Sequence, residues 1–192
     1  MKKVLVLTAH PDDLELACGG TVARFVDEGV EVTNLIVCSN VPHKKYVPES
    51  SKILGFNPLY LEHRDESITR EVVAEIEALI DISSYDLLIT HWKEDWHQDH
   101  RFCHDLGNSL RRKQPLNVWY MNAYPYCQKY TSFDASVFVD ITKYIEQKKN
   151  SILCYKNVPT KWAKDTEHLT AYRGAFIETQ HAEIFKADTL IV

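Results

Sequence analysis

Histidine and acidic side chains gather in the segment His10-Pro11-Asp12-Asp13, which follows the apolar residues 4–7 after Thr8 and Ala9. His10 and Asp13 are three residues apart across an expected strand-to-helix turn, which can direct both side chains at one point. A neutral imidazole with a carboxylate is a good partial ligand set for zinc. One acid could instead cap the following helix, but capping needs a single acid and does not use His10. The segment is therefore a candidate metal site.

A second such segment, His97-Gln98-Asp99-His100, follows the expected strand at residues 86–90, of which residues 87–89 are apolar. His97 and His100 share one face of a helical turn, so one could bind a metal ion while the other faces a substrate. Asp99 could hold a histidine ring in one tautomer through a hydrogen bond. His100 and His104, one helical turn apart, form a rival ligand pair.

The elements that position these two segments alternate along the chain. Strands are predicted at residues 4–7, 31–38, 59–61, 86–90, 118–121 and 137–139, and helices at 14–28, 49–54, 68–82, 97–112, 142–155 and 167–178. This alternation predicts an α/β fold with a doubly wound, largely parallel sheet and helices on both faces. Ligands of such sheets bind beyond the carboxyl ends of the strands, where both segments lie. Acids replace the glycine-rich turn of a dinucleotide site, so no such cofactor is expected.

Length and composition are those of one globular domain. The 192 residues are 45% hydrophobic and 26% charged, which predicts a single domain over residues 1–192. A formal net charge of −5 disfavours a dedicated nucleic-acid-binding protein. No apolar run approaches the roughly 20 residues of a membrane span. The acids after residue 10 do not fit a signal peptide, and five cysteines without a C-x-x-C pair indicate reduced thiols, so we expect a cytoplasmic protein.

The two segments resemble the motifs of a known family. Ala9–Glu15, followed by Gly19-Gly20-Thr21, is similar to the A-H-P-D-D-x-E…G-G-T signature of the LmbE-like, or PIG-L, N-acetylglucosaminyl deacetylases. His97–Arg101 resembles the family's H-x-D-H-R motif, and Ala182–Phe185 resembles its closing segment. The resemblance implies a Rossmann-like fold, one zinc ion per chain (Fe²⁺ being another divalent candidate) and hydrolysis of an N-acyl amide on an amino sugar.

The resemblance also implies a role for each motif residue. The implied metal ligands are His10, Asp13 and His100. The implied catalytic groups are Asp12 as general base, His97 as stabiliser of the developing oxyanion, and Asp99 as the group that orients His97. The chain departs from the family at Tyr155-Lys156-Asn157, where Ser-Gln is usual, and this departure leaves the identity of the sugar open.

Five further residues are candidate substrate contacts, each with an alternative structural role: Glu15, Arg64, Trp96, Arg101 and Tyr124. The expected substrate is a small amino-sugar conjugate, whose nucleotide or lipid linkage stays open, as does assembly into a homo-oligomer. Two other functions remain as alternatives. One is hydrolysis of a formyl or other small amide. The other is a sugar- or nucleotide-binding module without catalysis, which would bind no metal and release no amine.

Overall fold

Seven strands form one mixed sheet in the computed structural model, which describes residues 1–63, 70–126 and 133–189. The strands are β1 (Lys3–Thr8), β2 (Glu31–Ile36), β3 (Asn57–Tyr60), β4 (Leu87–His91), β5 (Asn117–Met121), β6 (Val137–Asp140) and β7 (Ala182–Thr189). Their order across the sheet is β3-β2-β1-β4-β5-β7-β6. The pairs among β1 to β5 are parallel, and β7 runs antiparallel to both β5 and β6.

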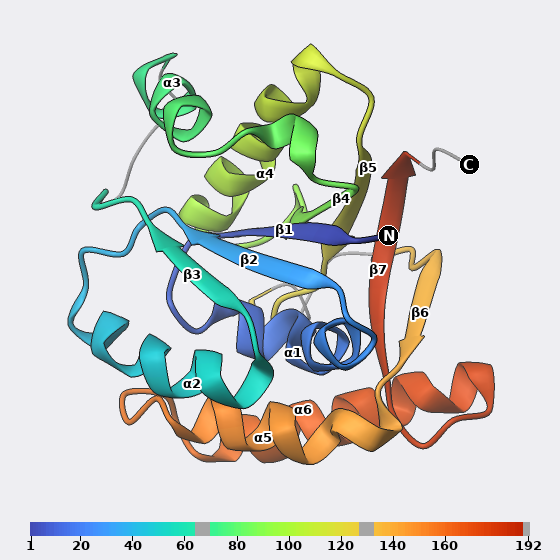
Figure 1. Cartoon of the computed structure of the whole chain (residues 1–192). Coiled ribbons are helices and arrows are strands. Elements are labelled where there is room, and N and C mark those ends of the chain that lie inside the picture. The colour runs from blue at the N-terminus through green and yellow to red at the C-terminus, as the bar shows by residue number, and fades with distance from the viewer. Residues whose placement is uncertain (64–69, 127–132, 190–192) are drawn as a thin grey trace.

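Helices cover both faces of this sheet. They are α1 (Asp13–Asp27), α2 (Val47–Leu54), α3 (Arg70–Leu79), α4 (Gln98–Leu110), α5 (Ile145–Leu153) and α6 (Lys161–Gly174). Figure 1 shows α3 and α4 on one face and α1, α2, α5 and α6 on the other. The structure thus confirms the predicted doubly wound α/β fold. Within the described part of the chain, no helix is long and apolar enough to cross a membrane.

The central strand β1 is buried on both faces, as its unbroken apolar sequence predicts. Val4 and Val6 pack into the core beneath α1, whereas Leu5 and Leu7 pack into the core beneath α4. All four side chains are fully buried. Side chains alternate between the faces of a strand, so β1 anchors both layers of helices to the sheet.

The strand order changes direction between β1 and β4, which lie side by side at the centre of the sheet. The chain leaves β1 into α1 on one face and leaves β4 toward α4 on the other (Figure 1). A crevice opens at such a point, beyond the carboxyl ends of the two strands. The His10–Asp13 and His97–His100 segments therefore meet at one edge of the sheet, as expected.

Two elements differ from the sequence-based expectation. Strand β7 was not predicted, because the buried charge of Glu183 and the polar Lys186 and Asp188 obscure its apolar pattern. Helix α6 begins at Lys161, six residues before the predicted start. Its buried face includes Ala163, Thr166 and Thr170, small or polar residues that give little hydrophobic signal. Strand β7 joins β5 to β6 in the sheet and also contacts α1, and α6 packs against β7.

The second glycine of the Gly19-Gly20-Thr21 motif is required by close packing. A Cβ at Gly20 would lie 2.6 Å from Cδ1 and 2.8 Å from Cβ of Ile141, whereas a Cβ at Gly19 would meet nothing closer than 3.4 Å. We expect Gly20→Ala to lower the free energy of unfolding by about 1–3 kcal/mol through overpacking. Gly19→Ala is the matched control and should be near neutral. Urea denaturation measures both, and equal stability of the two variants would contradict this packing argument.

Candidate active site

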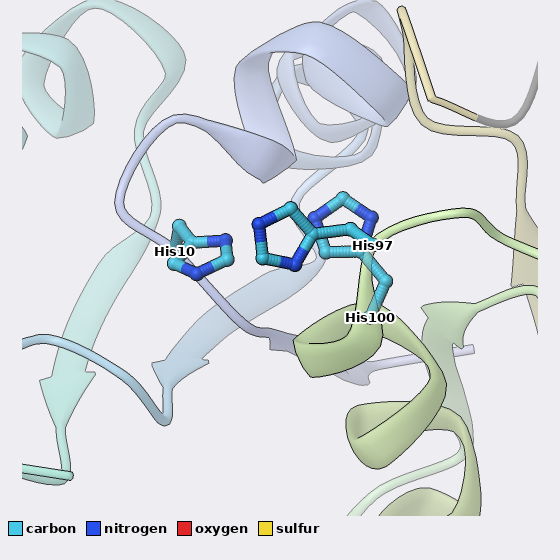
Figure 2. Close-up of side chains that lie close together, drawn as sticks. All are labelled: His10, His97 and His100. Atoms are coloured by element: carbon cyan, nitrogen blue, oxygen red, sulfur yellow. The ribbon is translucent and has the colours of Figure 1, made fainter. Parts of the chain in front are cut away.

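Two strand-to-helix turns bring three imidazole rings together. His10 follows β1, and His97 and His100 stand at the start of α4, after β4. The ring centroids are 4.7 Å apart for His10 and His97, 4.8 Å for His97 and His100, and 5.6 Å for His10 and His100 (Figure 2). Residues 87 positions or more apart in the sequence therefore form one cluster.

Asp13 lies at the centre of this cluster. Its Oδ2 accepts a hydrogen bond from the backbone N–H of His10 at 2.6 Å and lies 3.3 Å from Nε2 of His91. Its Oδ1 lies 3.1 Å from Nε2 of His100. Burial alone would raise the pKa of Asp13, but His100 and His91 hold that pKa well below its usual value. The side chain is therefore an ionised carboxylate surrounded by imidazoles.

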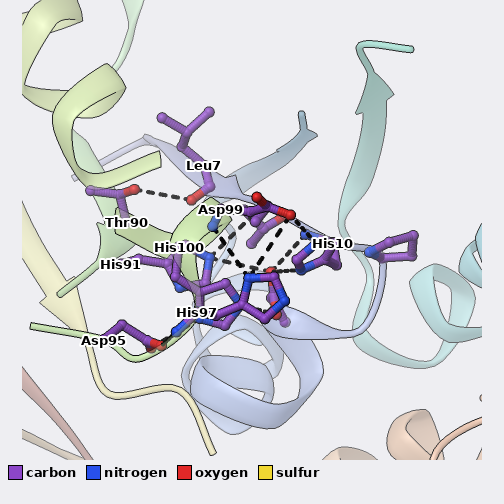
Figure 3. A network of polar contacts seen from close by, with 12 residues as sticks. Leu7, His10, Thr90, His91, Asp95, His97, Asp99 and His100 are labelled. Carbon is purple, nitrogen blue, oxygen red and sulfur yellow. Dashed lines mark hydrogen bonds and ion pairs between the residues drawn. The ribbon is translucent and has the colours of Figure 1, made fainter. Parts of the chain in front are cut away.

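His100 is oriented by Asp95 rather than by a neighbour in its own motif. The Nδ1 of His100 lies 2.9 Å from Oδ2 of Asp95, and both side chains are buried (Figure 3). The other ring nitrogen, Nε2, is buried and faces the carboxylate of Asp13, 3.1 Å from its Oδ1. Burial would lower the pKa of His100, but Asp13 and Asp95 raise it to about 10. The negative charges of Asp13 and Asp95, which stabilise a proton on His100, would also stabilise a metal cation at this place.

These residues fit a divalent metal ion. Metal-binding histidines usually donate their second ring nitrogen to a carboxylate, as His100 can to Asp95. His10 is held in the same way, with Nε2 3.0 Å from Oδ2 of Asp99, while its Nδ1 lies 3.7 Å from Oδ2 of Asp13. Two imidazole nitrogens and one carboxylate oxygen are a typical zinc donor set that leaves one position open.

The structure offers two geometric groups of donor atoms. Atoms of His10, His97 and His100 lie within 4.8 Å of one another, and so do atoms of Asp13, His91 and His100. The predicted ligand set of His10, Asp13 and His100 draws on both groups. His100 is common to all three sets, so it is the strongest candidate ligand.

Asp12 lies beside this cluster and outside both groups of donor atoms. It lines the same pocket as His10 and Asp13. Burial, and then the charge of Asp13, raises the pKa of Asp12 to about 6. A carboxyl with such a pKa can accept a proton at neutral pH and give it up again.

His97 combines a structural contact with an exposed edge toward the pocket. It is the N-cap of α4, where its Nδ1 accepts a hydrogen bond from the backbone N–H of Asp99 at 3.2 Å. Burial lowers the pKa of His97, and His100 and His10 lower it further. A neutral ring that accepts at Nδ1 carries its proton on Nε2. His97 can therefore donate a hydrogen bond without being charged.

Asp99 has a different partner from the one that the resemblance implied. Its carboxylate lies 3.0 Å from Nε2 of His10 but 3.9 Å from Nδ1 of His97. The His97 nitrogen is already engaged by the backbone of Asp99, so the carboxylate turns to the other ring. Asp99 thus links the two motifs directly.

The cluster opens into a pocket of about 390 Å³. Its lining combines polar, aromatic and aliphatic side chains from both motifs, from the segments after β2 and β5, and from the residues around the start of α6: His10, Asp12, Asp13, Leu16, Val41, His43, His97, Tyr124, Tyr126, Asn157, Val158, Pro159 and Trp162. Such a pocket can hold a small ligand with polar and apolar parts.

The structure places the predicted substrate contacts in different surroundings. Tyr124 lines the pocket, and its hydroxyl donates a hydrogen bond to Asp165 at 2.6 Å. Trp96 is 49% exposed and is not among the pocket residues. Arg101 donates to the carbonyl oxygens of Asp95 and Trp96 at 2.7 and 2.8 Å, so it braces the loop before α4. Arg64 lies outside the described residues.

Glu15 is fully buried and does not line the pocket. It accepts hydrogen bonds from Ser50 and from Tyr155, the latter at 3.0 Å. Burial raises the pKa of Glu15 to about 8. It therefore belongs to the support beneath the site.

His104 does not join His100 in a ligand pair. Its Nδ1 lies 3.0 Å from the carbonyl oxygen of His91, and its Nε2 lies 3.0 Å from the side-chain amide of Asn108. Both ring nitrogens are engaged within the protein, and neither group of donor atoms includes His104.

Sequence reasoning gave no role in the site to Asp95 or His91, and it considered Tyr126 only as a loop aromatic that could stack on a sugar ring. A metal-binding histidine usually donates its second ring nitrogen to a carboxylate. This rule could have identified Asp95, five residues before His100. Tyr126 packs edge-on against the rings of His97 and His100, with centroids 5.4 and 5.7 Å away. His91 is fully buried, which lowers its pKa to about 4. No local motif marks either of these two residues.

Comparison with known proteins adds family evidence to this geometry. Residues 5–110 match the PIG-L family, described as GlcNAc-PI de-N-acetylase. The chain is 27% identical over 115 residues to the uncharacterized deacetylase YaiS of Escherichia coli, and 28% identical over 128 residues to the diacetylchitobiose deacetylase of Thermococcus kodakarensis. These matches include 52% and 56% of this chain, but only 62% and 48% of those relatives.

Solved structures share the fold over nearly the whole chain. The conserved protein TT1542 of Thermus thermophilus has a TM-score of 0.86 and 24% identity, covering 100% of this chain and 97% of that one. GalB, a 4-carboxy-2-hydroxymuconate hydratase of Pseudomonas putida, has the same TM-score with 14% identity, covering 100% and 98%. Likeness at this level of identity shows the fold alone.

Proposed function

Because the chain belongs to the PIG-L family, matching it over residues 5–110, we propose that it is a zinc-dependent hydrolase that removes an N-acetyl group from an amino-sugar derivative. One observation carries this proposal. His10, Asp13 and His100 direct two imidazoles and a carboxylate at one region, and Asp12 lines the same pocket as His10 and Asp13. This arrangement has the parts that amide hydrolysis requires: a cation site, a base and a hydrogen-bond donor.

The reaction adds water across the amide and yields a free amine and acetate. When bound by His10, Asp13 and His100, zinc would supply acidity to a water molecule and polarise the amide carbonyl. Asp12 takes the proton of the attacking water and later delivers it to the departing nitrogen. His97 donates its Nε2 proton in a hydrogen bond to the carbonyl oxygen as negative charge develops there.

The neighbouring residues keep these groups in place. Asp95 holds the ring of His100, and Asp99 holds that of His10, which fixes the direction of each free ring nitrogen. Tyr126 packs edge-on against the rings of His97 and His100. Tyr124 and Trp162 add aromatic surface to the pocket, which favours a sugar ring as ligand.

Metal analysis combined with an amine-release assay tests this function. We expect the purified protein to hold one divalent ion per chain and to release amine from at least one N-acetylated sugar in a panel that includes nucleotide-linked sugars. A parallel N-formyl panel separates the acetyl from the formyl alternative. A metal-loaded protein that releases no amine from any of these compounds would contradict the proposal and favour a binding module.

His97→Asn separates the two roles of this residue. Asparagine is a preferred N-cap, so it should preserve the start of α4, but it is too short to replace the Nε2 donor. We expect kcat to fall about 10²–10³-fold, as for loss of one oxyanion donor. Metal content and melting temperature should stay those of the wild type. Loss of metal in step with loss of activity would instead make His97 a ligand.

A further inference from the structure

Helix α1 is broken one turn after it carries Asp13. Cys18 has non-helical backbone angles, with φ −138° and ψ 19°. In an unbroken α-helix the N–H of Gly20 would donate to the carbonyl of Leu16. Here the two groups bond to different side chains. The break therefore leaves backbone donors and acceptors that need other partners inside the protein.

Lys148 of α5 satisfies the carbonyl side of the break. Its Nζ donates to the carbonyl oxygens of Glu15 at 2.8 Å and Leu16 at 3.0 Å, and to Oε1 of Glu183 at 2.7 Å. These contacts use all three donors of a lysine ammonium group. The side chain is only 1% exposed. Lys148 thus caps the short first part of α1.

Glu183 of β7 satisfies the amide side of the same break. Its Oε1 accepts from the N–H of Gly20 at 3.0 Å, and its Oε2 accepts from the N–H of Thr21 at 2.7 Å. Its side chain is fully buried. A cation at the carbonyl end of one helical segment and an anion at the amide end of the next both match the helix dipoles. The ion pair therefore lies at the break in α1 and bonds to the backbone groups on both sides of it.

Stability alone does not explain a buried ion pair, because desolvation offsets most of its attraction and apolar residues of similar volume often stabilise as well. The location of this pair suggests a more specific task. The first part of α1 begins at Asp13 and follows Asp12. It is also held from the same side by Tyr155, just after α5, whose hydroxyl contacts the carbonyl oxygen of Pro11.

We propose that Lys148 and Glu183 are positioning residues, which fix the break in α1 and thereby hold Asp12 and Asp13 toward the histidines of α4. In its catalytic consequence, this inference rests on the proposed function. The support comes from α5 and β7, which lie late in the chain and pack against α1 (Figure 1). The C-terminal part of the fold thus sets the geometry of the N-terminal motif.

Lys148→Met tests this inference, because methionine keeps most of the length of lysine and removes its three donors. Lys149→Met is the matched control on the same helix. Lys149 pairs with Glu146 at 3.0 Å and Glu167 at 3.1 Å and is partly exposed. The readouts are metal affinity by chelator competition, the visible spectrum of the cobalt-substituted protein, kcat and KM.

We expect Lys148→Met to weaken metal binding and to lower kcat, each about 10–100-fold, the range for loss of a group that supports a metal ligand. KM should change little, and the cobalt spectrum should shift because Asp13 moves. Lys149→Met should match the wild type in all four readouts. If Lys148→Met folds with a lower melting temperature but wild-type metal affinity, spectrum and kcat, the pair is merely structural and the inference is wrong.

Two further measurements keep the test decisive. If Lys148→Met does not fold, Glu183→Gln, which keeps the shape of Glu183, is judged by the same criteria. If the wild type binds metal but hydrolyses no amide, the proposed function fails while the metal readouts still decide the inference. If the wild type binds no metal, hydrogen exchange of residues 13–21 decides it. Faster exchange confined to these amides in Lys148→Met supports positioning, and unchanged exchange contradicts it.

Discussion

Asp12→Asn is expected to lower kcat by about 10²–10⁴-fold, the usual contribution of a general base, while the metal content stays that of the wild type. Asparagine has nearly the shape of aspartate but cannot accept a proton. Asp12 lies in the pocket, and neither group of possible metal donors includes it. Its pKa, raised to about 6 by burial and then by Asp13, leaves it ionised at neutral pH. Steady-state kinetics with elemental analysis of the same sample measures both quantities.

Asp27→Asn is the matched control for this experiment. Asp27 ends the same helix α1 and accepts a hydrogen bond from Tyr144 at 2.8 Å, remote from the pocket. Its kcat should equal that of the wild type. If Asp12→Asn keeps full turnover, another group must move the proton. If it loses its metal instead, Asp12 is a ligand.

His100→Ala is expected to abolish both metal binding and turnover. Its Nε2 is buried 3.1 Å from Oδ1 of Asp13, and its Nδ1 is held by Asp95. Loss of one of three ligands should weaken binding by more than the roughly 10–100-fold typical of an outer partner. Titration of the metal-free protein with zinc, with a chelator as competitor, measures the change in affinity.

His104→Ala provides the comparison, because it lies on the same helix one turn further on. Both of its ring nitrogens are engaged, by the carbonyl of His91 and the side chain of Asn108. We expect this variant to bind zinc as the wild type does. Metal loss in His104→Ala with retention in His100→Ala would reverse the ligand assignment.

The meeting of the two motifs was predictable from the sequence. Each motif is a short local pattern after an apolar run. In a doubly wound sheet the strand order changes direction at the centre, and this brings β1 and β4 side by side. The alternation of strands and helices indicates such a sheet, so the motif residues are expected at one edge. The structure confirms the fold and places the predicted ligands together.

The supports of the site were not predictable in the same way. Asp95 takes a role that the nearer Asp99 could have filled, and only the path of the loop before α4 decides between them. Glu15 is fully buried because Ser50 and Tyr155, both distant in sequence, pack against it. Lys148 has the sequence pattern of an ordinary surface lysine. Its burial depends on the break in α1 and on β7, which no local pattern reveals.

Anomalous diffraction at the zinc absorption edge, from crystals of the zinc-loaded protein, locates the bound ion and identifies its ligands. We expect one strong peak at bonding distance, about 2.0–2.2 Å, from a nitrogen of His10, an oxygen of Asp13 and a nitrogen of His100. A peak bound instead by the three histidines His10, His97 and His100, or by Asp13 with His91 and His100, would contradict the assignment of ligands and of His97. The absence of any peak at this edge of the sheet would contradict the metal site itself.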